Sequence, residues 1–147
     1  MSTDLEVDGD VVFALVTDVA RLPEWNDRIE TLESPAGELG VGDRWTVRVH
    51  LPGKRFASVS EVLELDRGER RFIHRSKPDD DNPSHTVWSW TVEPAGPGAC
   101  TVHVSWSLQP RTASRRLVAV MRGRMLRSEV ARSIEQLGVA AGAPARA

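Results

Sequence analysis

From residue 28 to residue 108 the chain consists of strand-like segments separated only by turns, and this run constrains the fold more than any other feature. Six segments are predicted as strands, at 28–34, 43–51, 55–66, 70–77, 84–93 and 100–108, and apolar and polar residues alternate in 43–51, 84–93 and 100–108. The breaks between them are rich in glycine, proline and aspartate, which favour turns. Because no helix interrupts the series, neighbouring strands should pair as an antiparallel meander.

Helices are expected on both sides of this series. Residues 2–7 can form a very short first strand, and Asp8 or Asp10 can then cap a helix. Pro23 begins a second short helical turn with the sequence LPEWN. Residues 111–137 form a long helix by their periodicity. The sequence therefore predicts an α+β domain in which a curved antiparallel sheet wraps a long C-terminal helix.

The long helix carries two apolar stripes that do not share a face. The first stripe comprises Leu117, Val120 and Met121, and the second comprises Leu126, Val130, Ile134 and Leu137. A straight helix on one surface would bury only one stripe. We therefore predict a bend or a change of packing partner near Gly123, which lies between them. One half of the helix should pack on the sheet, and the other should cover a cavity.

Tryptophans gather on the apolar face of the predicted strands. Alternation places four of the five there, namely Trp45, Trp88, Trp90 and Trp106. Taken alone, each of them is better explained as a core aromatic residue. Their number favours a cavity wall instead, because each indole brings a large apolar surface together with an N–H group that needs a partner.

His74 is the one titratable side chain expected to face inward, since it shares parity with Phe72. It could carry protons, or it could be a structural histidine bonded to a backbone carbonyl. The other histidines, His50, His85 and His103, share parity with polar neighbours and should face solvent. No metal is expected, because these histidines lack metal-ligand spacing and Cys100 is the single cysteine. No phosphate-binding loop precedes a helix, so no cofactor is expected.

Charge is distributed unevenly along the chain. The net charge is −2, yet residues 110–137 hold seven arginines against Glu129 and Glu135. This pattern leaves open an adaptor that contacts an acidic partner, although a solvated or internally paired face is favoured and no nucleic acid is expected. No segment is apolar enough for stable membrane insertion, and the acidic start MSTDLEVDGD is unlike a secretory signal. We expect a cytoplasmic monomer or homodimer.

Several segments together resemble a known superfamily. They are VVFALVTDVARLPEWNDRIETLE, ELGVGDRW, VSEVLELDRGERRFIHRS, WSWTVEPAGPGACTVHVSWSL and ARSIEQLGVA. Over residues 8–140 the chain resembles the SRPBCC or START-like superfamily, in its polyketide cyclase/dehydrase and lipid-transport branch. The resemblance implies a helix-grip fold with a strand, two short helices, six further strands and a long C-terminal helix. Family members usually have a longer first strand, which a neighbouring chain could complete here.

The resemblance also implies an organisation and a site. Residues 1–140 should form a single ligand-binding domain, and 141–147 a flexible tail. In the family fold the turn containing Trp25 lies near the pocket mouth. The candidate ligand-binding residues are Trp25, Trp45, Phe56, Phe72, His74, Trp88, Trp90, Trp106, Met121 and Met125. The expected function is binding of a small hydrophobic or aromatic molecule, as a carrier or sensor. The alternative is a cyclase, aromatase or dehydratase acting in the same pocket, with His74 as its proton carrier.

Overall fold

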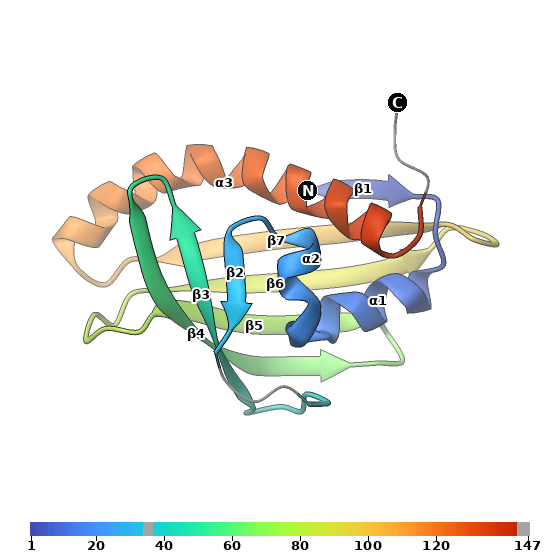
Figure 1. Ribbon diagram of the computed structural model, residues 1–147, viewed down its shortest axis with the longest axis horizontal. Helices are drawn as coiled ribbons and strands as arrows, with labels where there is room; N and C mark the ends of the chain where they lie inside the picture. Colours follow the sequence, from blue (N-terminus) through green and yellow to red (C-terminus); the bar gives the residue numbers. More distant parts are fainter. Residues whose placement is uncertain (34–36, 144–147) are drawn as a thin grey trace.

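A computed structural model describes residues 1–33 and 37–143 of the chain. Its elements follow one another in the predicted order (Figure 1). They are β1 (Ser2–Leu5), α1 (Gly9–Thr17), the 3-10 turn η1 (Val19–Arg21), α2 (Leu22–Trp25), β2 (Ile29–Leu32), β3 (Arg44–Leu51), β4 (Lys54–Asp66), β5 (Arg71–Pro78), β6 (His85–Pro94), β7 (Cys100–Gln109) and α3 (Ala113–Ala140). Residues 144–147 of the predicted tail lie outside the described residues.

The strands form one antiparallel sheet in the order β1-β7-β6-β5-β4-β3-β2. The six later strands are joined as the predicted meander. The first strand is short, with four residues, and it pairs with β7 of the same chain, with Thr3 opposite Val102. The predicted α+β helix-grip fold is confirmed.

Strand β4 produces much of the curvature of the sheet. It has 13 residues; its first part pairs with β3 and its last part with β5. The register shifts between Val62 and Glu64, as at a β-bulge, and a bulge bends a strand and increases its twist. Figure 1 shows β2 and β3 crossing steeply over the direction of β5, β6 and β7. The sheet therefore has a concave face, over which the helices lie.

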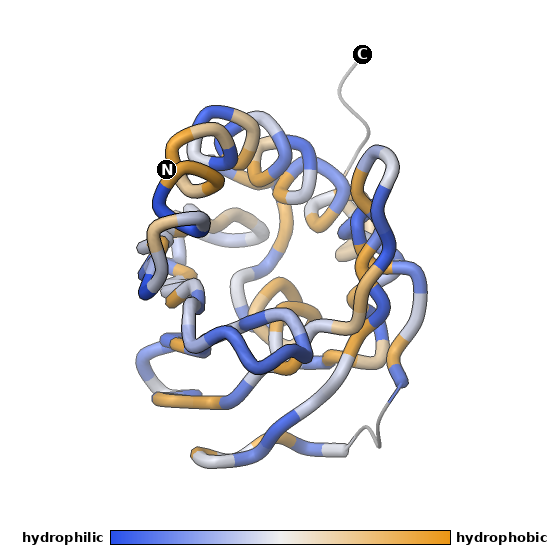
Figure 2. The backbone as a smooth tube through the Cα atoms, turned by 90° about the vertical axis from the view of Figure 1, so that its left-hand side faces the viewer, coloured by the Kyte–Doolittle hydropathy of each residue, from blue (hydrophilic) through white to orange (hydrophobic). Residues whose placement is uncertain are grey.

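The two short helices close one end of this concave face. Asp8 caps α1, since its side chain accepts a hydrogen bond of 2.8 Å from the amide of Asp10. Pro23 lies in the first turn of α2, where a missing amide hydrogen costs nothing. Four apolar residues of α1 are buried against the interior: Val12, Phe13, Leu15 and Val16. Figure 2 shows apolar and polar segments alternating along the chain around the interior.

The long helix α3 behaves differently in its two halves. Its second apolar stripe, Leu126, Val130, Ile134 and Leu137, is buried in the core as predicted. The prediction for the first stripe is wrong: Leu117, Val120 and Met121 are 68%, 67% and 66% exposed. The helix runs unbroken past Gly123. In this half the inner positions face a cavity, so the apolar stripe points away from the protein.

Candidate functional site

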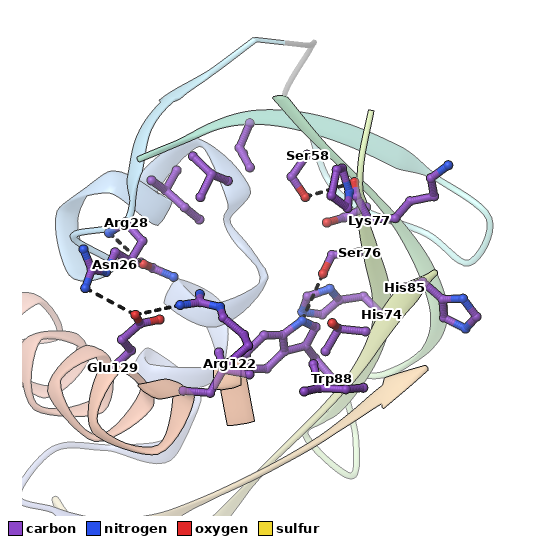
Figure 3. A pocket seen from close by; sticks show the side chains of 18 of the residues that line it. Asn26, Arg28, Ser58, His74, Ser76, Lys77, His85, Trp88, Arg122 and Glu129 are labelled. Atoms are coloured by element: carbon purple, nitrogen blue, oxygen red, sulfur yellow. Dashed lines mark hydrogen bonds and ion pairs between the residues drawn. The ribbon is translucent and has the colours of Figure 1, made fainter. Parts of the chain in front are cut away.

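A cavity of about 570 Å³ lies between the concave face of the sheet and the helices. A volume of this size accommodates a drug-sized molecule. Strands β3 to β7 supply one side of the lining, and the segment from α1 to β2 together with α3 supplies the other. Figure 3 shows these two sides, with Arg28, Arg122 and Glu129 opposite His74, Ser76 and Trp88.

A row of aromatic rings forms the sheet side of the cavity. The rings of Trp45 and Phe72 lie 6.2 Å apart between centroids, at an interplanar angle of 28°. Phe72 and His74 stack at 5.0 Å, and His74 and Trp88 stack at 6.4 Å with an angle of 13°. The row presents flat, polarisable surfaces against which another planar group can stack.

Trp25 and Trp90 adjoin this row and also line the cavity. They meet edge to face, with centroids 5.6 Å apart and an angle of 79°. Trp25 is only 2% exposed, and its indole Nε1 is buried without a hydrogen-bond partner among the described residues. Trp25 is therefore both a core residue and part of the cavity wall.

His74 lies within the aromatic row, and the part of its ring that remains accessible faces the cavity. Removal from bulk water lowers the pKa of its imidazole to about 3, because burial penalises the charged form. The Nδ1 atom has no hydrogen-bond partner among the described residues. The ring is thus neutral near pH 7, where its basicity is too low for efficient general base catalysis. A catalytic role for His74 stays a prediction.

Serines interrupt the apolar lining of β4 and β5. Ser58, Ser60 and Ser76 all line the cavity. Ser76 Oγ accepts a 3.0 Å hydrogen bond from Trp88 Nε1, and Ser58 Oγ donates a 3.2 Å hydrogen bond to the carbonyl of Lys77. These serines were not predicted as site residues, although strand alternation places them on the same face as Phe56 and Phe72. They give the sheet wall a few polar points.

A charged cluster, also not predicted from the sequence, occupies the helical side of the cavity. Glu129 Oε1 lies 3.2 Å from Arg28 Nη2 and 2.8 Å from Arg122 Nη1. Both arginine side chains are 24% exposed, whereas that of Glu129 is 8% exposed. The available signal was helical spacing, since residues 122, 126 and 129 fall on one face of a helix.

Seven of the ten candidate ligand-binding residues line the cavity: Trp25, Trp45, Phe56, Phe72, His74, Trp88 and Trp90. Trp106, Met121 and Met125 are outside the lining. Trp106 packs beside Trp88 with centroids 6.1 Å apart, and the two methionines lie on the exposed face of α3. His85, expected in solvent, lies at the rim, and Figure 3 shows it pointing away from the interior.

Metal sites and membrane-spanning helices are both absent from residues 1–33 and 37–143. No three histidine, cysteine, aspartate or glutamate side chains come together there as a metal site would require. No helix in this part of the chain has the length and apolar character needed to cross a membrane.

One protein family matches almost the entire sequence. The family described as "Polyketide cyclase / dehydrase and lipid transport" matches residues 1–141. The chain belongs to this family. No curated protein matches the sequence.

Solved structures of other proteins share the fold of this chain. The Zhui aromatase/cyclase from Streptomyces sp. R1128 has a TM-score of 0.80 at 14% identity, covering 96% of this chain and 90% of that one. The protein TTHA0849 from Thermus thermophilus has a TM-score of 0.72 at 17% identity, covering 96% and 94%. A START superfamily protein from Mycobacterium smegmatis has a TM-score of 0.66 at 14% identity, covering 91% of each chain. At these identities the likeness concerns the fold alone.

Proposed function

We propose that this protein binds a small hydrophobic or aromatic molecule, lipid-like or polyketide-like, in its internal cavity and acts as a carrier or sensor. The observation that carries the proposal is the aromatic row from Trp45 to Trp88 along a cavity of about 570 Å³. A largely apolar cavity with a few polar points is typical of small-molecule sites. The working unit in this proposal is a single cytoplasmic domain of residues 1–140.

The second candidate is a cyclase, aromatase or dehydratase. It is favoured by the polar groups that line the same cavity, Ser58, Ser76 and the cluster around Glu129, and by the fold shared with the Zhui aromatase/cyclase. The pKa of His74 argues against an enzyme, because burial lowers it to about 3. Such an enzyme needs an acid or base whose pKa lies nearer the working pH. Binding without chemistry therefore ranks first.

Native mass spectrometry of freshly purified protein tests the proposal. We expect a copurified small molecule, or, after mild delipidation, one-to-one complexes with hydrophobic aromatic compounds and fatty acids. Four tryptophans line the cavity, Trp25, Trp45, Trp88 and Trp90, so binding should also change tryptophan emission. A chain that binds none of these compounds, with unchanged emission, would contradict the proposal. Conversion of an added polyketide analogue would favour the enzyme instead.

A further inference from the structure

We infer that the helical side of the cavity holds an acidic group of the ligand, a carboxylate or a phenolate, while the ring system of the ligand lies on the aromatic row. This inference rests on the proposed function and adds the chemical class of the ligand. Its basis is the cluster of Arg28, Arg122 and Glu129, all three of which line the cavity.

The cluster has more positive than negative charge. Two guanidinium groups share one carboxylate, and both contact the same oxygen, Oε1 of Glu129, at 3.2 and 2.8 Å. The net charge of the three side chains is therefore +1 in a largely apolar cavity. Charges withdrawn from water are costly unless they are paired. An anion in the cavity would balance the remaining charge.

The cluster also has more hydrogen-bond donors than acceptors. A guanidinium has five N–H donors, and the Nε of Arg28 is buried without a partner among the described residues. The neighbouring lining residues Asn26 and Ser133 are neutral. Carboxylates and phenolates accept such bonds strongly, because charge-assisted hydrogen bonds exceed neutral ones.

The position of the cluster suits one orientation of the ligand. Figure 3 shows Arg28, Arg122 and Glu129 across the cavity from His74 and Trp88. A planar molecule that stacks on the aromatic row can thus direct one edge toward the guanidinium groups. A ligand with an acidic group on an aromatic or polyketide-like ring system meets both requirements.

The test compares 2-naphthoic acid and anthracene-2-carboxylic acid with their methyl esters by calorimetric titration at pH 7. We expect each acid to bind the wild type roughly 10- to 100-fold more tightly than its ester. A difference of this size corresponds to the usual contribution of hydrogen bonds to charged groups. Arg122→Gln should remove this preference while leaving ester affinity within about threefold. Arg132→Gln is the matched control on α3, because Arg132 pairs with Asp27 outside the cavity lining.

If Arg122→Gln folds poorly, Arg28→Gln provides a second test. This variant should also weaken binding of the acids while leaving binding of the esters largely unchanged. If esters and acids bind the wild type within twofold of each other, the cavity is a ligand site but the acidic-group inference is overturned. A preference for acids that survives both substitutions overturns it too. If none of the four compounds binds, the acidic-group inference is overturned, whereas the proposed function is decided separately by the mass spectrometry with aromatic compounds and fatty acids.

A second inference rests on a different observation, the outer face of α3. We propose that this face docks on an anionic lipid bilayer through residues 113–128. The exposed residues Leu117, Val120, Met121 and Met125 follow helical spacing on the side opposite the cavity. Single exposed apolar residues are ordinary, whereas a contiguous patch marks an interaction site.

Arginines are interspersed with this patch. Arg116, Arg124 and Arg127 have no ion pair within the part of the chain that the structure describes, and residues 111–128 contain no acidic residue. A second copy of the chain would bring these positive charges together, so the charge favours a negatively charged partner. A helix with apolar and arginine residues on its outer face is suited to the surface of anionic membranes. The opposite face of the same helix lines the cavity, so a docked helix would lie directly between the bilayer and the ligand.

Vesicle cosedimentation tests this docking with phosphatidylcholine vesicles and with vesicles containing 30% phosphatidylglycerol. We expect binding to the anionic vesicles only, weakened at least fivefold in 0.5 M salt because screening reduces attraction between exposed charges. Leu117→Ser with Met121→Ser, and separately Arg116→Gln with Arg124→Gln, should each weaken it at least fivefold. Val139→Ser is the control, since Val139 is exposed near the other end of α3.

The absence of binding to anionic vesicles would overturn the docking proposal. Binding that both double variants retain would overturn it as well. Retention on immobilised polyglutamate without vesicle binding would point to an acidic protein partner and would also overturn it. All substituted residues except Arg116 and Arg124 are among the exposed large apolar residues, so thermal unfolding should confirm that the variants fold.

Discussion

Gly138 of α3 faces Leu5 of β1 so closely that a Cβ on the glycine would lie 2.9 Å from Leu5 Cδ2. Contacts this short do not occur between a real Cβ and its neighbours, so a side chain at residue 138 would force Leu5 to shift. The end of the helix and the short edge strand are therefore held together through a position that lacks a side chain.

Gly138→Ala should be less favourable for stability than Gly123→Ala. A Cβ at Gly123 meets nothing within 4 Å, so Gly123→Ala should raise the free energy of unfolding by about 0.5–1 kcal/mol through helix propensity. Gly138→Ala should lose this gain to the displacement of Leu5, leaving a difference of at least ~1 kcal/mol between the variants. Urea unfolding measures both, and equal gains would contradict the close contact.

The burial of His74 should make the protein sensitive to acid. Its folded pKa of about 3 lies below the ordinary value of 6.5, so between these values the unfolded state binds the proton and the folded state does not. Stability should fall as pH decreases, by up to about 1.4 kcal/mol per pH unit. From pH 6 to pH 4.5 the wild type should lose roughly 2 kcal/mol more than His74→Phe.

The control for this acid sensitivity is His50→Gln, because His50 is exposed. This variant should follow the wild type across the same range of pH in urea unfolding. Parallel pH profiles for the wild type and His74→Phe would show that His74 titrates normally in the folded state.

The cap of α1 should contribute measurably to stability. Asp8 Oδ1 accepts a 2.8 Å hydrogen bond from the amide of Asp10, and its negative charge also interacts favourably with the helix dipole. Asp8→Ala should lower the free energy of unfolding by about 1 kcal/mol. Asp8→Asn should retain most of the stabilisation from the cap, because its side-chain oxygen can accept the same hydrogen bond. Thermal unfolding distinguishes the variants, and equal losses would mean that the side-chain oxygen does not act as the cap.

The hydrogen bond between Trp88 and Ser76 should appear as an energetic coupling. Trp88 Nε1 donates to Ser76 Oγ at 3.0 Å in the cavity wall, so Ser76→Ala should cost about 1 kcal/mol. In a Trp88→Phe background the same substitution should be nearly neutral, because no donor remains. A double-mutant cycle measures the difference, and a coupling near zero would mean that the bond contributes no net stability.

Strand alternation was the most reliable guide to both fold and site. It placed Trp45, Phe72 and Trp88 on the concave face, because side chains of a strand point to alternate faces whatever the rest of the fold does. The turn residues located the strand ends, and the structure confirms the meander. These features depend on residues close in sequence, and so they can be predicted from it.

The helical side of the cavity could not be predicted in the same way. Apolar periodicity assumes that each apolar stripe of a helix has a protein partner, and Leu117 and Met121 of α3 have none among the described residues. The inward residues of that half include Arg122, which pairs with Glu129. Which helix face meets the cavity depends on how α3 lies across the sheet, a long-range property that no local pattern contains.

The two halves of α3 have different roles, because only the second half is packed in the core. Residues from Leu126 onward are fixed in the core by Leu126, Val130, Ile134 and Leu137. The preceding turns contact the cavity on one side and solvent on the other. An outward displacement of these turns would break the ion pair between Arg115 and Asp80 but would leave the buried stripe of the second half in place. Substitutions before Leu126 should therefore alter how fast a ligand enters and leaves, whereas substitutions of the buried residues Val130, Ile134 and Leu137 should reduce the stability of the fold.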